Sequence, residues 1–211
     1  MKAVLKAFGL LLVVATILIV AVFIWVDSRG ISAKAEPGRL ETAVARTMRR
    51  LAIPGDARDR KNPVALSPEV IAEGMGHYAD HCASCHANDG SGETEIGRGL
   101  YPKAPDMRLP ATQSLTDGEL FYIIENGVRL TGMPAWSTGQ PDGEESTWHL
   151  VHFIRELPRL SPQTIDEMKR LNPRSPAEIQ QEIEEEKFLR GEGDGVPPQP
   201  SPTHEHAGAH K

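Results

Sequence analysis

An uncharged apolar segment near the N-terminus sets the first limit on the architecture of this chain. Residues 7–26 carry no charged side chain. As an α-helix, with a rise of about 1.5 Å per residue, they would span the roughly 30 Å of a bilayer core. A globular helix of this length normally shows a polar stripe, and this segment shows none. The sequence therefore predicts an N-terminal membrane anchor over residues 1–28.

A cleaved signal peptide is the alternative interpretation of this segment. Lys2 and Lys6 precede the apolar residues, and Ala33-Lys34-Ala35 resembles a cleavage site. The apolar segment is longer than the usual signal-peptide core of ~7 to 15 residues, which favours an uncleaved anchor. The charges on its two sides orient the span only weakly.

Charged residues divide the rest of the chain into three parts. Residues 27–66 carry nine Lys/Arg against five Asp/Glu, residues 67–158 carry five against fourteen, and residues 159–211 carry seven against ten. We therefore predict a basic linker over residues 29–66 and an acidic domain, of net charge −9, over residues 67–158. A protein partner of this domain should present a basic surface.

Hydrophobic patterning predicts an all-α fold. The 211 residues suffice for one domain of ordinary size with appendages, and because only 5% are aromatic, the core should be small. No segment alternates apolar and polar residues for long enough to predict a sheet. The helical domain should be followed by a helical extension over residues 159–190. Residues 191–211, rich in Gly, Pro and His, should form a disordered tail.

Capping signals place five helices after the linker. Ser67 is the expected N-cap of the first helix, which should continue to about His81. A capping box of Thr116 and Glu119 should begin the second helix, and Gly127 should end it. The other three are expected over residues 146–157, stopped by Pro158, from Ser161-Pro162, and from Ser175 to Gly191 with Glu178 as the capping partner.

The two cysteines and the histidine after them form the pattern of c-type haem attachment. They are the only cysteines, and they lie in Cys82-Ala83-Ser84-Cys85-His86. Two thiols at this spacing can reach the two vinyl groups along one edge of a porphyrin, and the imidazole then lies under the iron. A redox-active dithiol would need a preceding strand, and a zinc site would need two further ligands; neither is evident in the sequence. We therefore predict that Cys82 and Cys85 bind haem as thioethers and that His86 is an axial ligand of its iron.

Met133 is the predicted second axial ligand. A six-coordinate electron carrier gains from a soft, neutral thioether, which favours ferrous iron. Met133 lies between Gly132 and Pro134, in a loop that can aim one side chain at the cofactor. His149 and His152 are the alternative axial ligands. The methionines expected to fill the core instead are Met75, Met107 and Met168.

The acidic domain resembles the single-haem class I c-type cytochromes. The resemblance rests on the attachment motif, on Gly-Met-Pro around Met133, on Gly74 and Tyr78, and on the helix from Trp148 to Phe153. In that family a glycine and an aromatic residue of the first helix cross an aromatic residue of the last helix. The resemblance therefore implies that Gly74 and Tyr78 contact Phe153.

The resemblance also implies a cofactor, its orientation and a location. A proline carbonyl after the attachment site would accept the other N–H of His86, and Pro102 and Pro105 are the two candidates. One haem c would be bound covalently to each chain. Because haem is attached to such proteins outside the cytoplasm, the domain should lie on the periplasmic side of the inner membrane, held by a single-pass helix.

The expected function is single-electron transfer rather than enzymatic catalysis. The chain would relay electrons between redox-partner proteins with basic docking sites, as a free carrier or as a subunit of a respiratory or dehydrogenase complex; no nucleic-acid partner is expected. A peroxidase-like enzyme, the first alternative, would need an open sixth position on the iron, and Met133 argues against it. The second is a haem-based sensor or a metal-handling protein, for which the tail offers His204, His206 and His210.

Overall fold

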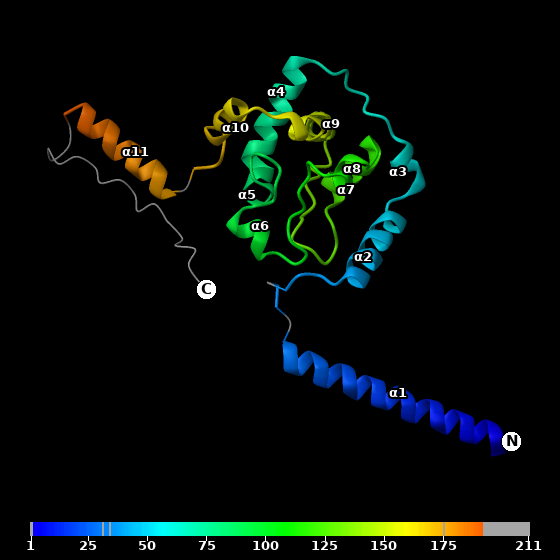
Figure 1. Ribbon diagram of the computed structural model, residues 1–211. Helices are drawn as coiled ribbons and strands as arrows, with labels where there is room; N and C mark the ends of the chain where they lie inside the picture. Colours follow the sequence, from blue (N-terminus) through cyan, green and yellow to red (C-terminus); the bar gives the residue numbers. More distant parts are fainter. Residues whose placement is uncertain (1, 31, 34, 175, 192–211) are drawn as a thin grey trace.

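The protein is built from helices alone in the part of the chain that the structure describes. The computed structural model describes residues 2–30, 32–33, 35–174 and 176–191. No strand forms across these ranges, which confirms the all-α prediction. A helical domain lies at the centre, and α1 and α11 extend away from it (Figure 1). The helices are α1 (Lys2–Arg29), α2 (Arg39–Ala52), α3 (Gly55–Asp59), α4 (Pro68–His77), the π-helical turn η1 (Tyr78–Cys82), α5 (Ala83–His86), α6 (Glu95–Gly99), α7 (Pro110–Gln113), α8 (Asp117–Asn126), α9 (Pro141–Glu156), the 3-10 turn η2 (Leu157–Arg159), α10 (Pro162–Lys169) and α11 (Pro176–Leu189).

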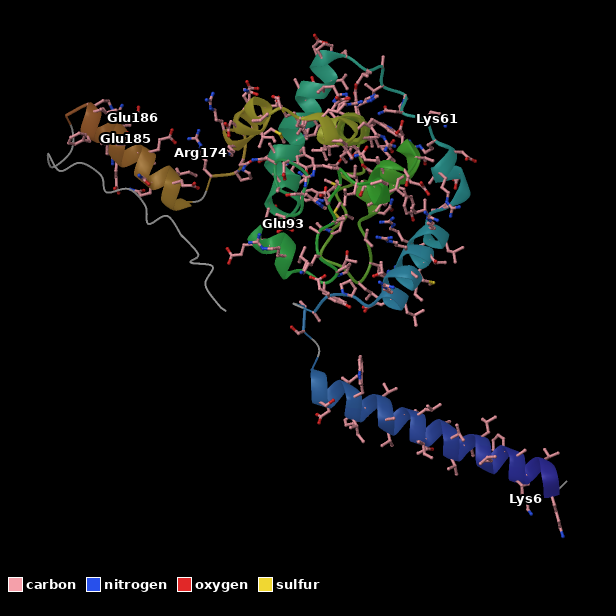
Figure 2. All side chains as sticks on the ribbon, in the orientation of Figure 1. Lys6, Lys61, Glu93, Arg174, Glu185 and Glu186 are labelled. Carbon is pink, nitrogen blue, oxygen red and sulfur yellow. The ribbon has the colours of Figure 1, made fainter. Side chains whose placement is uncertain are left out.

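Helix α1 carries the apolar N-terminal segment. Within it, Val4–Ser28 is long and apolar enough to cross a membrane, judged by length and composition. None of that segment is buried against the rest of the protein, and its side chains project on all sides of the helix (Figure 2). The predicted span is thus helical, and a signal sequence would have the same properties.

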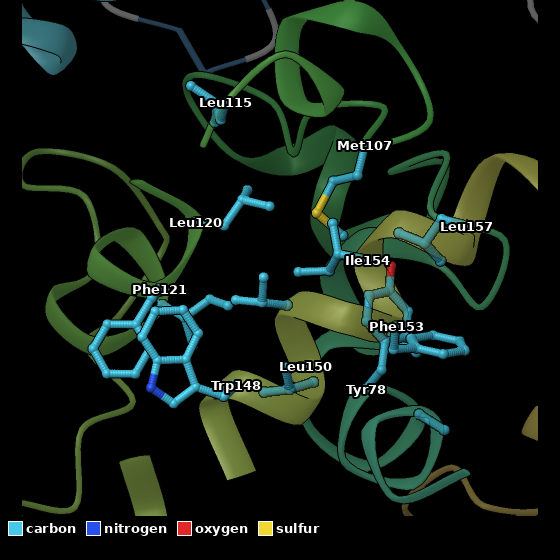
Figure 3. Packing of buried hydrophobic residues seen from close by; sticks show 14 of the residues in the cluster. Tyr78, Met107, Leu115, Leu120, Phe121, Trp148, Leu150, Phe153, Ile154 and Leu157 are labelled. Carbon is cyan, nitrogen blue, oxygen red and sulfur yellow. The ribbon is translucent and has the colours of Figure 1, made fainter. Parts of the chain in front are cut away.

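The centre of the domain is the crossing of α4 with α9. A Cβ on Gly74 would overlap the backbone carbonyl of His149, so a glycine is needed for the two helices to approach this closely. Next to this contact, the rings of Tyr78 and Phe153 lie 5.2 Å apart (Figure 3), and both side chains are fully buried. The contact expected between Gly74, Tyr78 and Phe153 is confirmed.

Local capping signals predicted several helix starts correctly. The Ser67 hydroxyl accepts a hydrogen bond from an amide in the first turn of α4, and Thr116 and Glu119 form the expected capping box of α8. Ser161 caps α10. The cap expected at Ser175 lies outside the described residues.

Two helix boundaries differ from the prediction. The first helix does not end near His81, because α4 continues through the π-helical turn η1 into α5, so that the cysteine motif is itself helical. The last helix of the domain begins at Pro141 rather than at Ser146. Proline at the first helical position, followed by the acidic residues Asp142 and Glu144, favours this earlier start.

The linker contains two helices that the sequence analysis did not predict, and its second half packs onto the domain. A Cβ on Gly118 of α8 would overlap the Ala57 carbonyl of α3. The Thr116 hydroxyl donates a hydrogen bond of 2.9 Å to the Arg58 carbonyl. The Arg60 guanidinium lies 4.3 Å from the centre of the Phe121 ring. The linker is therefore part of the folded unit.

The C-terminal extension has one packed helix and one exposed helix. Met168 of α10 is fully buried in the core cluster, as expected for a core methionine. Helix α11 lies apart from the domain (Figure 1), and Arg174 forms an ion pair with its Glu182. The tail that was expected to be disordered spans residues 191–211, and all of it after Gly191 lies outside the described part of the chain.

Candidate functional site

A cavity of about 400 Å³ lies among the helices and is lined mainly by apolar side chains. Cys82, Cys85, His86 and Met133, the four predicted site residues, all line it. Figure 3 shows part of its apolar wall, which comes from α8, α9 and the segment before α8. Such a cavity, apolar with a few polar side chains, is the usual form of a site for a small molecule or cofactor. Its apolar wall includes Leu115, Leu120, Ile123, Ile124, Leu150 and Ile154.

The loop after the cysteine motif holds the backbone of the motif. The Thr94 hydroxyl donates to the Cys85 carbonyl at 3.1 Å, and the Gly97 amide donates to that hydroxyl at 2.8 Å. The Gly92 amide donates to the His86 carbonyl at 2.9 Å. A Cβ on Gly97 would overlap the Cys85 carbonyl, so the loop needs glycine to approach the motif. These contacts keep Cys85 and His86 at the cavity wall.

Both cysteines of the motif are free thiols. Burial, and to a smaller extent the neighbouring Cys85, raise the pKa of the Cys82 thiol to about 12. Cys82 is therefore protonated at neutral pH. The motif follows helix α4 and the turn η1 rather than the strand that a redox-active dithiol would need. Both sulfurs are available to attach a cofactor.

The imidazole of His86 is held in its neutral form. Burial lowers its pKa, and a weaker interaction with the Pro105 carbonyl opposes this effect. The buried Nδ1 nevertheless lacks a partner with good hydrogen-bond geometry, so this contact falls short of a well-formed hydrogen bond. Neutral imidazole is the form that coordinates metals. Of the two prolines considered, Pro105 rather than Pro102 interacts with His86.

The loop that carries Met133 is folded back onto the end of α8. The Val128 amide donates to the Met133 carbonyl at 3.1 Å, and the Trp136 amide donates to the Ile124 carbonyl at 3.1 Å. Gly127, which follows α8 as predicted, has a φ of 66°, and a Cβ there would lie 2.7 Å from the Met133 carbonyl oxygen. A larger residue would be both strained and crowded at this position. The loop therefore keeps Met133 at the cavity.

His149 and His152, the alternative axial ligands, have other partners. Nδ1 of His149 lies 2.8 Å from a carboxylate oxygen of Glu73, and Nε2 of His152 lies 2.9 Å from the Val64 carbonyl oxygen. Neither histidine lines the cavity. Met107, expected in the core, is buried but also lines the cavity, so that it is a second thioether at the same wall.

Helix α2 contributes a wall of the cavity that was not predicted from the sequence. Glu41, Thr42, Arg46 and Arg49 of this linker helix line it, whereas the charge count indicates only a basic linker. The signal lies in the spacing, because Thr42, Arg46 and Arg49 recur at helical intervals and share one face. That periodicity predicts an amphipathic helix but not which face meets the domain.

The residues at the cavity fit a covalently bound haem. Two free thiols, a neutral imidazole and a thioether line one mainly apolar space. Thiols that attach the porphyrin, with histidine and methionine as axial ligands, are the donor set of electron-carrying c-type cytochromes.

Comparison with known protein families identifies the same class. Residues 69–154 match the family described as cytochrome c oxidase, cbb3-type, subunit III. This segment is a c-type cytochrome domain, a class that binds haem c and supports haem-based electron transfer. The chain matches no curated protein sequence. Helix α1, the linker and the C-terminal extension lie outside the family match.

Proposed function

We propose that this chain is a single-electron carrier with one haem c, attached through Cys82 and Cys85 and coordinated by His86 and Met133. The observation that carries the proposal is the shared cavity, because all four side chains line one mainly apolar space in a c-type cytochrome domain. The attachment motif and the Met133 loop are far apart in the sequence. Their meeting at one space is what two axial ligands of a single iron require.

Each of these residues has a distinct role in the proposed carrier. The bound haem supplies an iron that accepts and returns one electron. Covalent bonds from Cys82 and Cys85 keep the cofactor from being lost. His86 would offer Nε2 to the iron, with Nδ1 directed to the Pro105 carbonyl, which would orient the ring once this contact closes to a hydrogen bond. Met133 offers a neutral sulfur, which favours the ferrous state and raises the reduction potential.

In the same proposal, α1 is an uncleaved single-pass anchor in the inner membrane, and the haem domain lies on the periplasmic side. Support comes from the length and apolar composition of α1 and from the class of the domain. Residues 30–38 would then keep the domain near the membrane and raise its effective concentration at a membrane-bound partner. The intact mass of the mature protein tests this, because cleavage after Ala35 would remove the anchor.

The redox partners should present basic surfaces to the domain, because residues 67–158 carry a net charge of −9. The linker already meets part of this charge, since Arg58 lies 3.9 Å from Glu119 and Arg60 lies 3.5 Å from Glu144. A partner would dock on the remaining acidic surface through a small, transient and salt-sensitive interface. We infer a free carrier or a subunit of a respiratory or dehydrogenase complex; the matched family is itself an oxidase subunit.

Replacing both cysteines tests covalent attachment. We expect the Cys82→Ala/Cys85→Ala variant to carry no haem after denaturing electrophoresis. The matched control is Ser84→Ala, which changes an exposed residue between the two cysteines and should keep the haem. Haem staining of the gel and the intact mass of the protein give the result. Haem that remains on the denatured double variant would refute the assignment.

A further inference from the structure

We propose that Arg46 and Arg49 of linker helix α2 bind the two propionate carboxylates of the haem, so that the linker completes the cofactor site. This inference rests on the proposed function, because it takes haem as the cofactor. Both arginines lie outside residues 69–154, so the family match assigns them no role.

Helix α2 is positioned over the cavity by contacts at both of its ends. Near its start, the Tyr101 hydroxyl donates a hydrogen bond to the Glu41 carboxylate, and Lys103 forms an ion pair with Glu36. Just after its end, Ile53 is buried. Figure 1 shows α2 beside the domain, in line with α3. The helix therefore forms one wall of the cavity rather than a free connection to α1.

The orientation of α2 is the reverse of what apolar burial alone would produce. Its large apolar side chains are exposed: Leu40 by 79%, Val44 by 53%, Met48 by 61% and Leu51 by 72%. An amphipathic helix normally turns such a stripe towards the core. Here the face with the arginines is turned to the cavity instead. This orientation indicates that the inner side of α2 faces a group that attracts positive charge.

The two arginines at the cavity form no ion pair with any residue that the structure describes. Nε of Arg49 is buried and forms no hydrogen bond. Burial, followed by repulsion from Arg46 and Arg50, lowers the pKa of Arg49, and the attraction of Glu119 offsets this only in part. Arg46 forms no ion pair in the described part of the chain. Arg49 is half-buried and Arg46 is exposed. A negative charge beside them would stabilise most the guanidinium that is partly removed from water.

The haem propionates carry the negative charge that would pair with the arginines of α2. A haem combines an apolar ring with two carboxylates, and the cavity combines a mainly apolar lining with two arginines that form no ion pair among the described residues. A guanidinium can bind a carboxylate through two parallel hydrogen bonds, which a lysine cannot form. Lys103 and Glu41 on the same wall already have partners in Glu36 and Tyr101. Two propionates and the two arginines of this wall therefore match in charge and in number.

Positive charge at this wall should also tune the cofactor. Reduction removes one positive charge from the iron, so nearby cations stabilise the reduced state relative to the oxidised one. The linker would then raise the reduction potential of the domain to which it is attached.

The experiment uses the full-length protein in detergent and compares charge removal at two positions of α2 that line the cavity with charge removal at one that does not. The test variant is Arg46→Gln/Arg49→Gln. The matched control is Arg50→Gln, which changes an exposed arginine of the same helix that does not line the cavity. Covalent haem content is measured first, and the midpoint potential is then measured by redox titration.

We expect every variant to keep its covalent haem. At a fixed potential, the ratio of ferrous to ferric protein should fall about tenfold in the test variant, which is about 59 mV for a one-electron couple. Arg50→Gln should change the ratio of ferrous to ferric protein less than about threefold, because an exposed charge is screened by solvent. Arg49→Lys, which keeps the charge but loses the paired hydrogen bonds, should fall between wild type and Arg49→Gln.

Two results would overturn the inference. The first is an unchanged midpoint potential in the test variant. The second is an equal shift in Arg50→Gln, which would reflect the net charge of the helix and not a contact. If the test variant loses its haem, the midpoint potentials of the single variants Arg46→Gln and Arg49→Gln are each compared with that of Arg50→Gln. A shift in neither single variant, or a shift equal to that of Arg50→Gln, would overturn the inference. Wild-type protein without covalent haem would instead refute the proposed function.

Discussion

Two helices that line the cavity, α9 and α2, are held in place by different forces. Helix α9 buries most of one face: it crosses α4 at Gly74, and its Trp148 stacks on Phe121 with the ring centres 4.1 Å apart. Helix α2 has no buried residue and is held by polar and charged contacts near its start and by the packed segment that follows it. The comparison shows that one wall of the cavity depends on apolar packing and the other on charge.

This difference predicts which helix the domain can hold in place without haem and which helix the haem helps to hold. Apolar packing at the α4–α9 crossing is insensitive to ionic strength, whereas exposed charges are screened beyond about 8–10 Å at physiological salt. If Arg46 and Arg49 bind the propionates, α2 should depend on haem and α9 should depend on it much less.

The largest expected effect is an all-or-none change at the sixth position of the iron. Met133→Ala should leave the haem attached but allow carbon monoxide to bind the reduced protein, because the thioether ligand is gone. Met107→Ala, which removes the other thioether at the cavity wall, is the control. It should keep the position closed while lowering the free energy of unfolding by about 2–5 kcal/mol. Carbon monoxide difference spectra decide the point, and the reverse pattern would transfer the ligand role to Met107.

The next largest effect is expected at the helix crossing. Gly74→Val should lower the free energy of unfolding by about 3 kcal/mol, because its Cβ would overlap the His149 carbonyl. Gly76→Val is the matched control on the same helix, since no atom lies within 4 Å of a Cβ there. Denaturant unfolding followed by circular dichroism measures both variants. Equal losses of stability would mean that the crossing is not as close as described.

Removing the haem should lower the local stability of α2 more than that of α9. In the Cys82→Ala/Cys85→Ala variant, amides of α2 should exchange with solvent about tenfold faster than in the haem-loaded protein, which corresponds to about 1.4 kcal/mol of local stability. Amides of α9 should change less, because their helix keeps its apolar contacts. Hydrogen exchange read by mass spectrometry measures both segments in one sample. An equal change in α2 and α9 would mean that α2 does not depend on the haem more than α9 does.

The smallest effects are expected where the linker meets α8 and α9. Arg60→Ala removes the guanidinium over the Phe121 ring together with the ion pair to Glu144, and should cost about 1 kcal/mol. Glu144→Gln removes only the exposed ion pair and should cost less than about 0.5 kcal/mol. Thermal unfolding of the two variants at low and high salt measures the difference. A larger loss from Glu144→Gln than from Arg60→Ala would show that charge, not stacking, attaches this part of the linker.

Several helix ends of the domain and the haem-attachment motif could be predicted from the sequence because their signals are local. Ser67, Thr116 and Gly127 mark helix ends through contacts with residues a few positions away. The attachment motif is likewise complete within five residues. The contact of Gly74 with α9 followed from the family resemblance and not from any local pattern.

The cavity wall formed by α2 could not be predicted, because the placement of this helix depends on tertiary structure. The spacing of Arg46 and Arg49 indicates a helical face, but hydrophobic patterning would have turned the opposite face inward. The choice of Pro105 over Pro102 likewise depends on how the chain folds back on His86. The presence of Met107 at the cavity follows from the packing of the loop before α7 and not from its neighbours in the sequence.

The central claim, a covalent haem with histidine and methionine ligands, is tested most directly by the visible absorption spectrum of the purified full-length protein. The account predicts a low-spin spectrum in both oxidation states and, in the ferric protein, the weak long-wavelength charge-transfer band of sulfur coordination. A high-spin spectrum without that band would contradict ligation by Met133 and would favour an open, ligand-binding iron. Protein without a haem spectrum, produced in cells that contain the attachment machinery, would contradict the account as a whole.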